Sequence, residues 1–257
     1  MLEGRSFNTT FITGDTGIGK GTLLKGLGIH LPEHGVSVSH ISSGDLLREI
    51  KTIYNNGETD HPYAHHLLGI VSRADIEAMD RRELVDPNVI VNMVFRAVAH
   101  VANEGSDVVF LESVSRTIPQ HLEYMRRFKE LGKRNTITRL DLELHAPEHI
   151  VLARLLDRDE NRADDADKEA QRARYFRIKA ETDPMVALIR QQIASGELDS
   201  EYHRIDAMGT KEEVLAKAIH AILSSDRVNS HYQNGVMTFH RDGNLLVPNP
   251  SRIIHPH

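Results

Sequence analysis

Short apolar runs alternate along the chain with longer segments in which apolar residues recur every three or four positions. A short run of β-branched and aromatic residues bounded by turn residues predicts a strand, whereas the longer spacing predicts a helix with one buried face. The predicted strands are 7–13, 36–41, 107–114, 137–145 and 202–207. The predicted helices are 20–31, 44–54, 87–103, 118–131, 147–158, 165–195 and 211–224.

This regular alternation of strand and helix predicts the fold class. Strands separated by helices form a parallel sheet, because each connection crosses back over the sheet, so we expect an α/β domain of about five strands with helices on both faces. The domain is expected to span residues 1–225. Residues 226–257 break the alternation, and there the runs VMTFH and LLV flank RDGN, the pattern of a β-hairpin in a C-terminal tail.

Composition and charge exclude several classes of function. The 257 residues are 40% apolar, enough for a sizeable core, and contain no cysteine, which excludes disulfides and thiolate metal sites. A formal net charge of -6 provides no basic field for holding nucleic acid. No apolar run approaches the roughly 18 residues that span a bilayer, and MLEGRSFNTT lacks the apolar core of a signal peptide. We expect a cytoplasmic monomer without nucleic acid or membrane partners.

The clearest chemical motif is GDTGIGKGT at residues 14–22, between a predicted strand and a predicted helix. It fits the start of a phosphate-binding loop, in which backbone N–H groups and the positive end of a helix dipole surround a phosphate and Lys20 reaches the terminal phosphates. The general pattern continues with Ser or Thr, but Gly21 fills that position and Thr22 follows one residue later. The alternative interpretation is an ordinary glycine-rich turn between a strand and a helix.

Four further motifs follow the loop in a fixed order. They are HISSGDLLR at 40–48, ELVDPNVI at 83–90, ESVSRTIPQ at 112–120 and RLLDRDENRADD at 154–165. Together with GKGT, they resemble the adenylate kinase family of nucleoside monophosphate kinases over about residues 7–223. The resemblance implies a P-loop α/β kinase fold and transfer of a phosphoryl group from Mg-ATP to AMP, giving two ADP.

The resemblance also implies how metals are used. In the family the magnesium ion rides on nucleotide phosphates and water rather than on a loop hydroxyl, which accounts for Gly21 and Thr22. Residues 154–165 look like the short form of the family's helical lid, without the insertion that carries zinc ligands in some members, so no structural zinc is expected. Glu112 matches the carboxylate that contacts magnesium through water.

The family's other functional residues carry over position by position. The implied contacts with ATP are Gly17, Ile18, Gly19, Lys20, Gly21, Thr22, Arg154 and Arg158. The implied contacts with the acceptor are Ser43, Arg48, Val85, Ser113, Arg116, Gln120, Arg162 and Arg174. The implied catalytic residues are Lys20, Arg116, Arg158, Arg162 and Arg174.

The residue types suit this chemistry without the resemblance. Phosphoryl transfer requires two anions held in line and their charge neutralised, and arginines do both. Arg154, Arg158 and Arg162 share one helix face if the helix continues through them. The alternative is a solvated face paired with neighbouring acidic residues.

Two of the expected acceptor motifs also have a capping interpretation. Ser42 to Asp45 is able to cap a helix, and Thr117 to Gln120 has the T-x-x-Q form of a capping box.

Several positions depart from the family pattern. Thr16 replaces a proline in the loop, Glu112 an aspartate, Ser113 a glycine beside the monophosphate, and Arg82 a glycine beside the acceptor base. Because most of these changes lie on the acceptor side, two alternatives stay open. One is a kinase for another nucleoside or deoxynucleoside monophosphate, and the other is a nucleotide-binding regulatory protein that has lost transfer.

Overall fold

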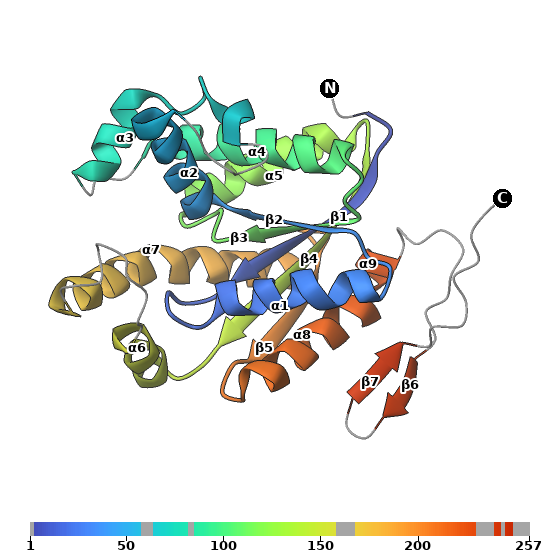
Figure 1. Cartoon of the computed structure of the whole chain (residues 1–257). Coiled ribbons are helices and arrows are strands. Elements are labelled where there is room, and N and C mark those ends of the chain that lie inside the picture. Colours follow the sequence, from blue (N-terminus) through green and yellow to red (C-terminus); the bar gives the residue numbers. More distant parts are fainter. Residues whose placement is uncertain are drawn as a thin grey trace.

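The computed structural model describes residues 3–57, 64–81, 85–157 and 168–229, together with the backbone of 239–242 and 245–248. Its centre is a five-stranded sheet in the order β2-β3-β1-β4-β5, in which every neighbouring pair is parallel (Figure 1). The predicted α/β class and parallel sheet are therefore confirmed. The strands are β1 Ser6–Thr13, β2 Val38–Ser42, β3 Val108–Glu112, β4 Thr136–His145 and β5 Glu201–Asp206.

Helices connect the strands and cover both faces of the sheet. Each predicted helix is present within a few residues, whereas η1, α3 and α9 are short and lack a long apolar repeat that would have predicted them. The helices are α1 Lys20–Glu33, α2 Ser43–Asn56, η1 Ala64–Leu67, α3 Arg73–Asp80, α4 Pro87–Asn103, α5 Ile118–Gly132, α6 Glu148–Leu156, α7 Lys168–Ala194, α8 Lys211–Ser224 and α9 Asp226–Asn229. Among the helices of the described ranges, none is long and apolar enough to cross a membrane.

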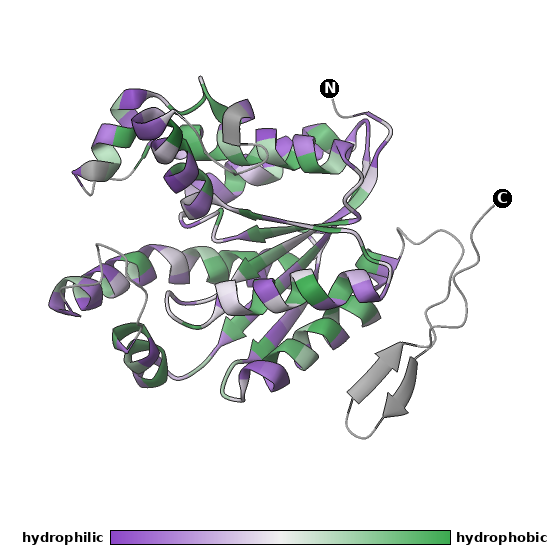
Figure 2. Cartoon of the chain, viewed as in Figure 1, coloured by the Kyte–Doolittle hydropathy of each residue, from purple (hydrophilic) through white to green (hydrophobic). Residues whose placement is uncertain are grey.

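The sheet separates two apolar cores. On one face, Phe11 and Leu111 pack with residues of α2, α4 and α5, and on the other face Ile12 and Leu142 pack with α1 and α8. Alternate residues of a strand point to opposite faces, so the strands supply both cores. Figure 2 shows apolar residues along the sheet and on the helix surfaces that face it.

Two ends of the predicted elements differ from expectation. The helix predicted at 147–158 ends at Leu156, with Asp157 as its C-cap, so α6 does not carry three arginines on one face, and Arg158 and Arg162 lie outside the described residues. At the C-terminal side, α9 packs on the sheet through the fully buried Val228. In the tail, β6 (Phe239–Asp242) and β7 (Leu245–Pro248) pair antiparallel.

The strand order locates a binding crevice. The connection after β1 leads past β3 to β2, whereas β4 lies on the other side of β1. The carboxyl end of β1 is thus a topological switch point, where ligands bind in open α/β sheets. The glycine-rich loop lies at this end, between β1 and α1.

Candidate active site

The loop after β1 has a backbone that only glycine accommodates at three positions. Gly14, Gly17 and Gly19 have φ values of 133°, 92° and 106°. A Cβ atom at Gly14 would lie 2.6 Å from the carbonyl oxygen of Leu144, and one at Gly17 would lie 2.8 Å from Cβ of Leu155. Gly19 is the left-handed N-cap of α1. These glycines let the chain turn sharply from β1 into the start of a helix, as a phosphate loop requires.

Lys20 points back into this loop. Its side chain is nearly buried, and Nζ donates hydrogen bonds to the carbonyl oxygens of Gly14 at 2.8 Å and Asp15 at 2.9 Å. A buried ammonium needs such partners, and a phosphate would be a stronger one. Gly21 differs from the loop glycines, because a Cβ there would meet nothing within 4 Å, and Thr22 is exposed. Packing therefore does not explain the glycine at position 21.

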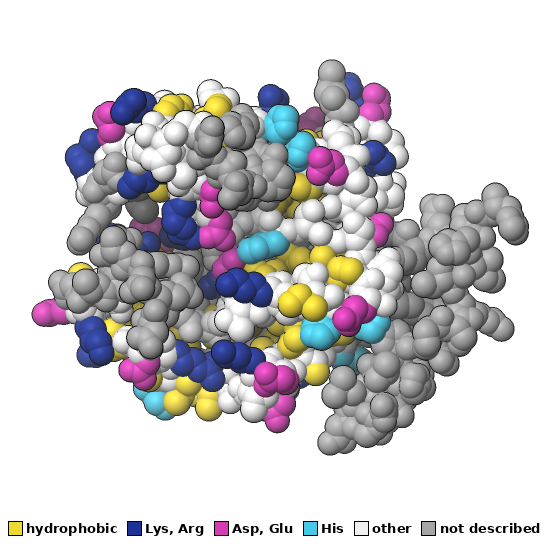
Figure 3. All heavy atoms as spheres, in the orientation of Figure 1, with side chains coloured by type: hydrophobic (Ala, Val, Ile, Leu, Met, Phe, Trp, Pro, Cys, Tyr) yellow, Lys and Arg dark blue, Asp and Glu magenta, His cyan; other side chains and the backbone are white. Residues whose placement is uncertain are grey.

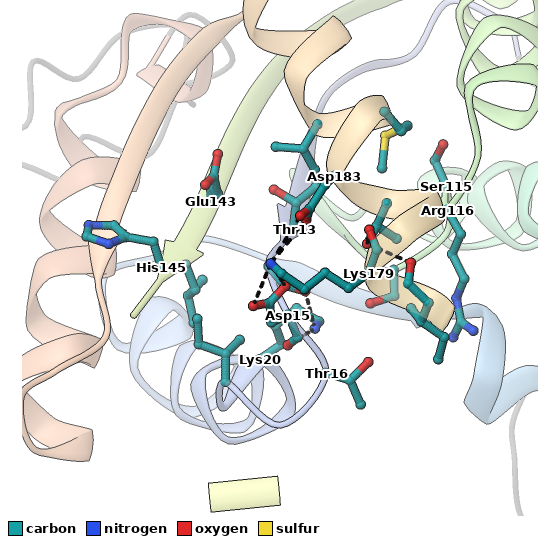
Figure 4. A pocket seen from close by; sticks show the side chains of 18 of the residues that line it. Thr13, Asp15, Thr16, Lys20, Ser115, Arg116, Glu143, His145, Lys179 and Asp183 are labelled. Atoms are coloured by element: carbon teal, nitrogen blue, oxygen red, sulfur yellow. Dashed lines mark hydrogen bonds and ion pairs between the residues drawn. The ribbon is translucent and has the colours of Figure 1, made fainter. Parts of the chain in front are cut away.

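A cavity of about 330 Å³ lies beside the loop (Figure 4). The loop, the carboxyl end of β4, α7 and the segment between β3 and α5 contribute its walls, and Ile18, Lys20 and Arg116 are among the lining residues. The volume falls within the range of small-molecule sites. Figure 3 shows basic and acidic side chains close together beside the hollow on this side of the molecule.

Three arginines from different elements lie close enough for their charges to interact, and one of them, Arg116, lines this cavity. Arg116 precedes α5, Arg174 comes from α7 and Arg48 from α2. Burial lowers the pKa of Arg116, the charges of Arg174 and Arg48 lower it further, and Glu181 and Glu112 raise it, with a net decrease. A lowered pKa means that the cation is destabilised by its surroundings. An anion bound among these guanidinium groups would relieve that destabilisation.

The expected acceptor residues of α2 have local partners. Arg48 forms an ion pair with Asp45, and both side chains are exposed. Ser42, rather than Ser43, caps α2, accepting a hydrogen bond from the amide of Asp45 at 3.3 Å. Ser43 is buried and donates through Oγ to the carbonyl oxygen of Ser113 at 3.2 Å. The capping interpretation therefore applies to Ser42 and leaves Ser43 facing the β3 side. Val85 is buried in the core that includes α2 and α4.

Gln120 is partly committed to the start of α5. Its Oε1 accepts a hydrogen bond from the amide of Arg116 at 2.9 Å, and its own amide donates to Oγ1 of Thr117 at 3.4 Å. The side chain is buried. Thr117 is therefore an N-cap, whereas Gln120 binds the residue before the cap instead of completing a capping box. Its Nε2 hydrogens are the donors that it can offer to a ligand.

Arg154, the remaining expected ATP contact among the described residues, lies on α6. Arg154 donates through Nη1 to the carbonyl oxygen of Ala207 at 2.8 Å, which ties α6 to the segment after β5. The structure thus brings Lys20, Arg116 and Arg174 to one region, and it fixes Arg154 at the end of β5.

Comparisons with known proteins found a similar sequence and a similar structure. No family model matches the chain. It is 27% identical over 207 residues to a protein named adenylate kinase from Flavobacterium johnsoniae, covering 79% of this chain and 92% of that one. The chain is thus similar to an adenylate kinase over most of its length. A solved gluconokinase from Sinorhizobium meliloti 1021 aligns with a TM-score of 0.48 and 11% identity, covering 90% of this chain and 99% of the other.

The departures from the adenylate kinase pattern have structural consequences at β3. Ser113, in place of a glycine, has a φ of 49° and is the one non-glycine residue with positive φ in the described ranges. The left-handed conformation costs a residue with a Cβ atom about 1 kcal/mol or more and is found most often at functional sites. Glu112 lies beside it, and its Oε2 is 3.1 Å from Nε2 of His40 on β2.

The structure also adds functional candidates that the motifs did not indicate. The phenol of Tyr175 donates to Oδ2 of Asp15 at 2.9 Å, and Nζ of Lys179 lies 3.3 Å from the same oxygen. We call Asp15, Tyr175 and Lys179 the loop cluster. Burial raises the pKa of Tyr175, and the hydrogen bond with Asp15 raises it further. Two signals could have identified the cluster: a carboxylate inside a glycine-rich loop, and the four-residue spacing of Tyr175 and Lys179 on one helix face.

Proposed function

We propose that this adenylate kinase homologue transfers the γ-phosphoryl group of Mg-ATP to a nucleoside monophosphate, with AMP as the favoured acceptor. One observation carries the proposal: Lys20 of the phosphate loop and Arg116 line the same cavity, and like charges crowd Arg116. A site that only sensed ATP would not need a second cationic group opposite the loop. Two cationic sites around one cavity suit two anionic substrates.

The expected roles follow from position. The loop amides and Lys20 hold the phosphates of ATP, because they surround the N-terminus of α1. Arg116 and Arg48 hold the phosphate of the acceptor, and Arg174 stabilises charge on the group in transfer. Each guanidinium binds phosphate best through paired hydrogen bonds. Arg158 and Arg162 are assigned to transfer by resemblance alone.

The residues fit a magnesium ion carried by the nucleotide. In the described ranges, no group of three His, Cys, Asp or Glu side chains could hold a metal by itself. Gly21 offers no hydroxyl, whereas Glu112 offers a carboxylate at the end of β3, and magnesium is commonly held by one or two carboxylates, water and substrate phosphates. When bound, the ion would neutralise phosphate charge, and Glu112 would orient its water.

The identity of the acceptor base is supported by fewer contacts than the phosphate sites are. Gln120 is the expected reader of the base, and its Oε1 is already used by the Arg116 amide. Its remaining N–H donors suit a ring nitrogen of adenine and also a base carbonyl. The name of the homologous protein favours AMP. A kinase for another monophosphate is the second candidate, because the Nε2 donors of Gln120 suit a base carbonyl as well as a ring nitrogen.

The test is an assay of the purified protein with Mg-ATP and separate AMP, dAMP, CMP, UMP and GMP, with products resolved by chromatography. We expect AMP or dAMP to give the highest kcat/KM. A higher kcat/KM for CMP, UMP or GMP would mean that the acceptor carries a base other than adenine. If ATP binds and no monophosphate is phosphorylated, the protein is a nucleotide-binding regulator instead.

A further inference from the structure

The first four residues of the phosphate loop after Gly14 form a tight turn. The amide of Ile18 donates to the carbonyl oxygen of Asp15 at 3.3 Å, and Gly17, the third residue of the turn, has a φ of 92°. Thr16, the second residue of the turn, has a negative φ. This combination defines a type II turn, in which proline is favoured at the second residue. Thr16 occupies that position and leaves its φ angle less restricted than proline would.

Asp15 is held from outside the loop at the same point. Its carboxylate accepts hydrogen bonds from the phenol of Tyr175 at 2.9 Å and from Nζ of Lys179 at 3.3 Å. Tyr175 is almost fully buried in the core, so its hydroxyl is a fixed donor. Lys179 is partly exposed and also pairs with Asp183 at 3.1 Å, one turn further along α7. Figure 4 shows Asp15 and Lys179 in the cavity near Lys20, and Tyr175 also lines the cavity.

Asp15 also contacts the lysine that the loop presents to the nucleotide. Its carbonyl oxygen accepts from Nζ of Lys20 at 2.9 Å. One residue therefore joins Lys20, through its backbone, to α7, through its side chain. A carboxylate beside bound phosphates is unfavourable by itself, and its pairing with Tyr175 and Lys179 compensates that repulsion.

We propose that the loop cluster is a clamp by which α7 fixes the turn of the phosphate loop and positions Lys20, in the place where a proline would otherwise fix the turn. Tyr175 and Lys179 are positioning residues that act through Asp15, not groups that contact the substrates. The inference rests on the proposed function, since it assumes that the loop holds the phosphates of ATP.

The test compares two tyrosine variants that lose a similar bond. Tyr175→Phe removes the phenol that holds Asp15. The matched control Tyr202→Phe removes a phenol that does not line the cavity and that donates to the carboxylate of Glu143 on β4. We expect Tyr175→Phe to lower kcat/KM for ATP about tenfold, the size of one hydrogen bond to a charged group. Tyr202→Phe should lower the melting temperature similarly and leave kcat/KM near that of the wild type.

Restoring the proline separates positioning from a general structural role. Thr16→Pro in the Tyr175→Phe background should recover most of the lost kcat/KM, because the ring presets the φ angle that the clamp otherwise maintains. Thr16→Pro alone measures what the ring itself does to the loop, and the recovery in the double variant is judged against it. Equal kinetic losses in the two tyrosine variants, or no recovery with proline, would overturn the proposal.

A second variant keeps the test valid if Tyr175→Phe folds poorly. Lys179 is partly exposed, so Lys179→Met should fold. We expect it to lower kcat/KM less than Tyr175→Phe does, and we expect Thr16→Pro to recover this loss as well. A larger loss that proline does not restore would mean that Lys179 contacts phosphate directly, which contradicts the clamp. ATP binding to the same variants, measured by calorimetry without an acceptor, distinguishes the two failures. Unchanged affinity and unchanged turnover reject the clamp, whereas absent turnover in the wild type rejects the kinase assignment.

Discussion

Two clusters of similar chemistry hold α7 in place, and they attach it to different parts of the molecule. The loop cluster ties α7 to the phosphate loop. The second, which we call the sheet cluster, consists of Glu143 on β4, Tyr202 on β5 and Arg190 on α7. In it Nε of Arg190 donates to Glu143 at 2.8 Å and to the phenol of Tyr202 at 2.9 Å. In both clusters a tyrosine and a cation bind one carboxylate.

The clusters differ in burial and in what depends on them. The side chain of Glu143 is buried within the sheet. Burial raises the pKa of Tyr202, and the hydrogen bond between Tyr202 and Glu143 raises it further, to about 12. Arg190 is partly exposed, but the buried carboxylate of Glu143 depends on its hydrogen bonds to Arg190 and Tyr202, so the sheet cluster should determine stability. The carboxylate of Asp15 is less buried, but its backbone contacts Lys20. The loop cluster should therefore determine activity more than stability.

The largest effect should come from the lysine beside the loop cluster. Lys20→Met removes the ammonium expected to stabilise charge on the phosphoryl group, so kcat should fall by about three orders of magnitude while the melting temperature changes little. Lys25→Met, an exposed lysine on the same helix, is the matched control and should retain wild-type kinetics. Turnover by Lys20→Met equal to that of the wild type would refute the phosphate-loop assignment.

The sheet cluster should show the opposite behaviour. Glu143→Gln leaves the exposed Arg190 without its charged partner, and because solvent screens that charge it should lower the free energy of unfolding by about 1.5 kcal/mol in chemical denaturation. Glu143 and Arg190 also line the cavity, but the variant leaves the hydrogen bonds of Lys20 and Asp15 intact, so the activity of each folded molecule, measured well below the melting temperature, should fall less than in Tyr175→Phe. Lost activity in a variant of unchanged stability would show that the two clusters are not separate in function.

The arginines extend the comparison to the acceptor. Arg48→Ala should raise KM for the monophosphate about tenfold or more, since it removes a charge-assisted contact with phosphate, and it should leave ATP binding near normal. Arg116→Ala should act in the same direction with a larger loss in kcat. Arg126→Ala, an exposed arginine on α5 paired with Glu123, is the control. Weaker binding of ATP alone by the Arg48 variant would contradict the division of the site.

The smallest effect concerns the pH dependence of stability, and it comes from a histidine of α5 that contacts α7. His121 is buried, Nε2 lies 2.8 Å from Oε1 of Gln192, and Nδ1 has no hydrogen-bond partner among the described residues. Burial lowers its pKa, which the Gln192 bond only partly offsets. Below about pH 6.5 the unfolded chain therefore binds a proton that the folded protein does not, and stability falls as the pH falls through that window.

His121→Gln removes this proton and can keep a hydrogen bond to Gln192. Denaturation curves between pH 5 and 7 should show a shallower loss of stability in the variant, by up to about 1.4 kcal/mol per pH unit. Kinetics at pH 7.5 should match the wild type, because His121 does not line the cavity. Identical pH slopes would show that His121 titrates alike in both states.

The sequence predicted the sheet and the loop because both depend on local patterns. Alternating apolar runs indicate strands and helices, and the order of glycines and Lys20 indicates the phosphate loop. The pairing of Asp15 with Lys179 joins residues 164 positions apart, and no local pattern encodes such a contact. The hydrogen bond from the Arg116 amide to Oε1 of Gln120 is likewise not encoded by a local pattern, because it depends on the backbone conformation at the start of α5. Residue types were therefore predictable, whereas their partners were not.

The central claim is that the loop and the arginines around the cavity carry out transfer between two nucleotides. Its most direct test is to incubate the protein with magnesium, ATP labelled at the γ-phosphorus and unlabelled AMP, and to follow the label by chromatography. We predict that the label appears in ADP formed from AMP, and that Lys20→Met abolishes this transfer. Label that remains in ATP, or that appears only in inorganic phosphate, would contradict the account.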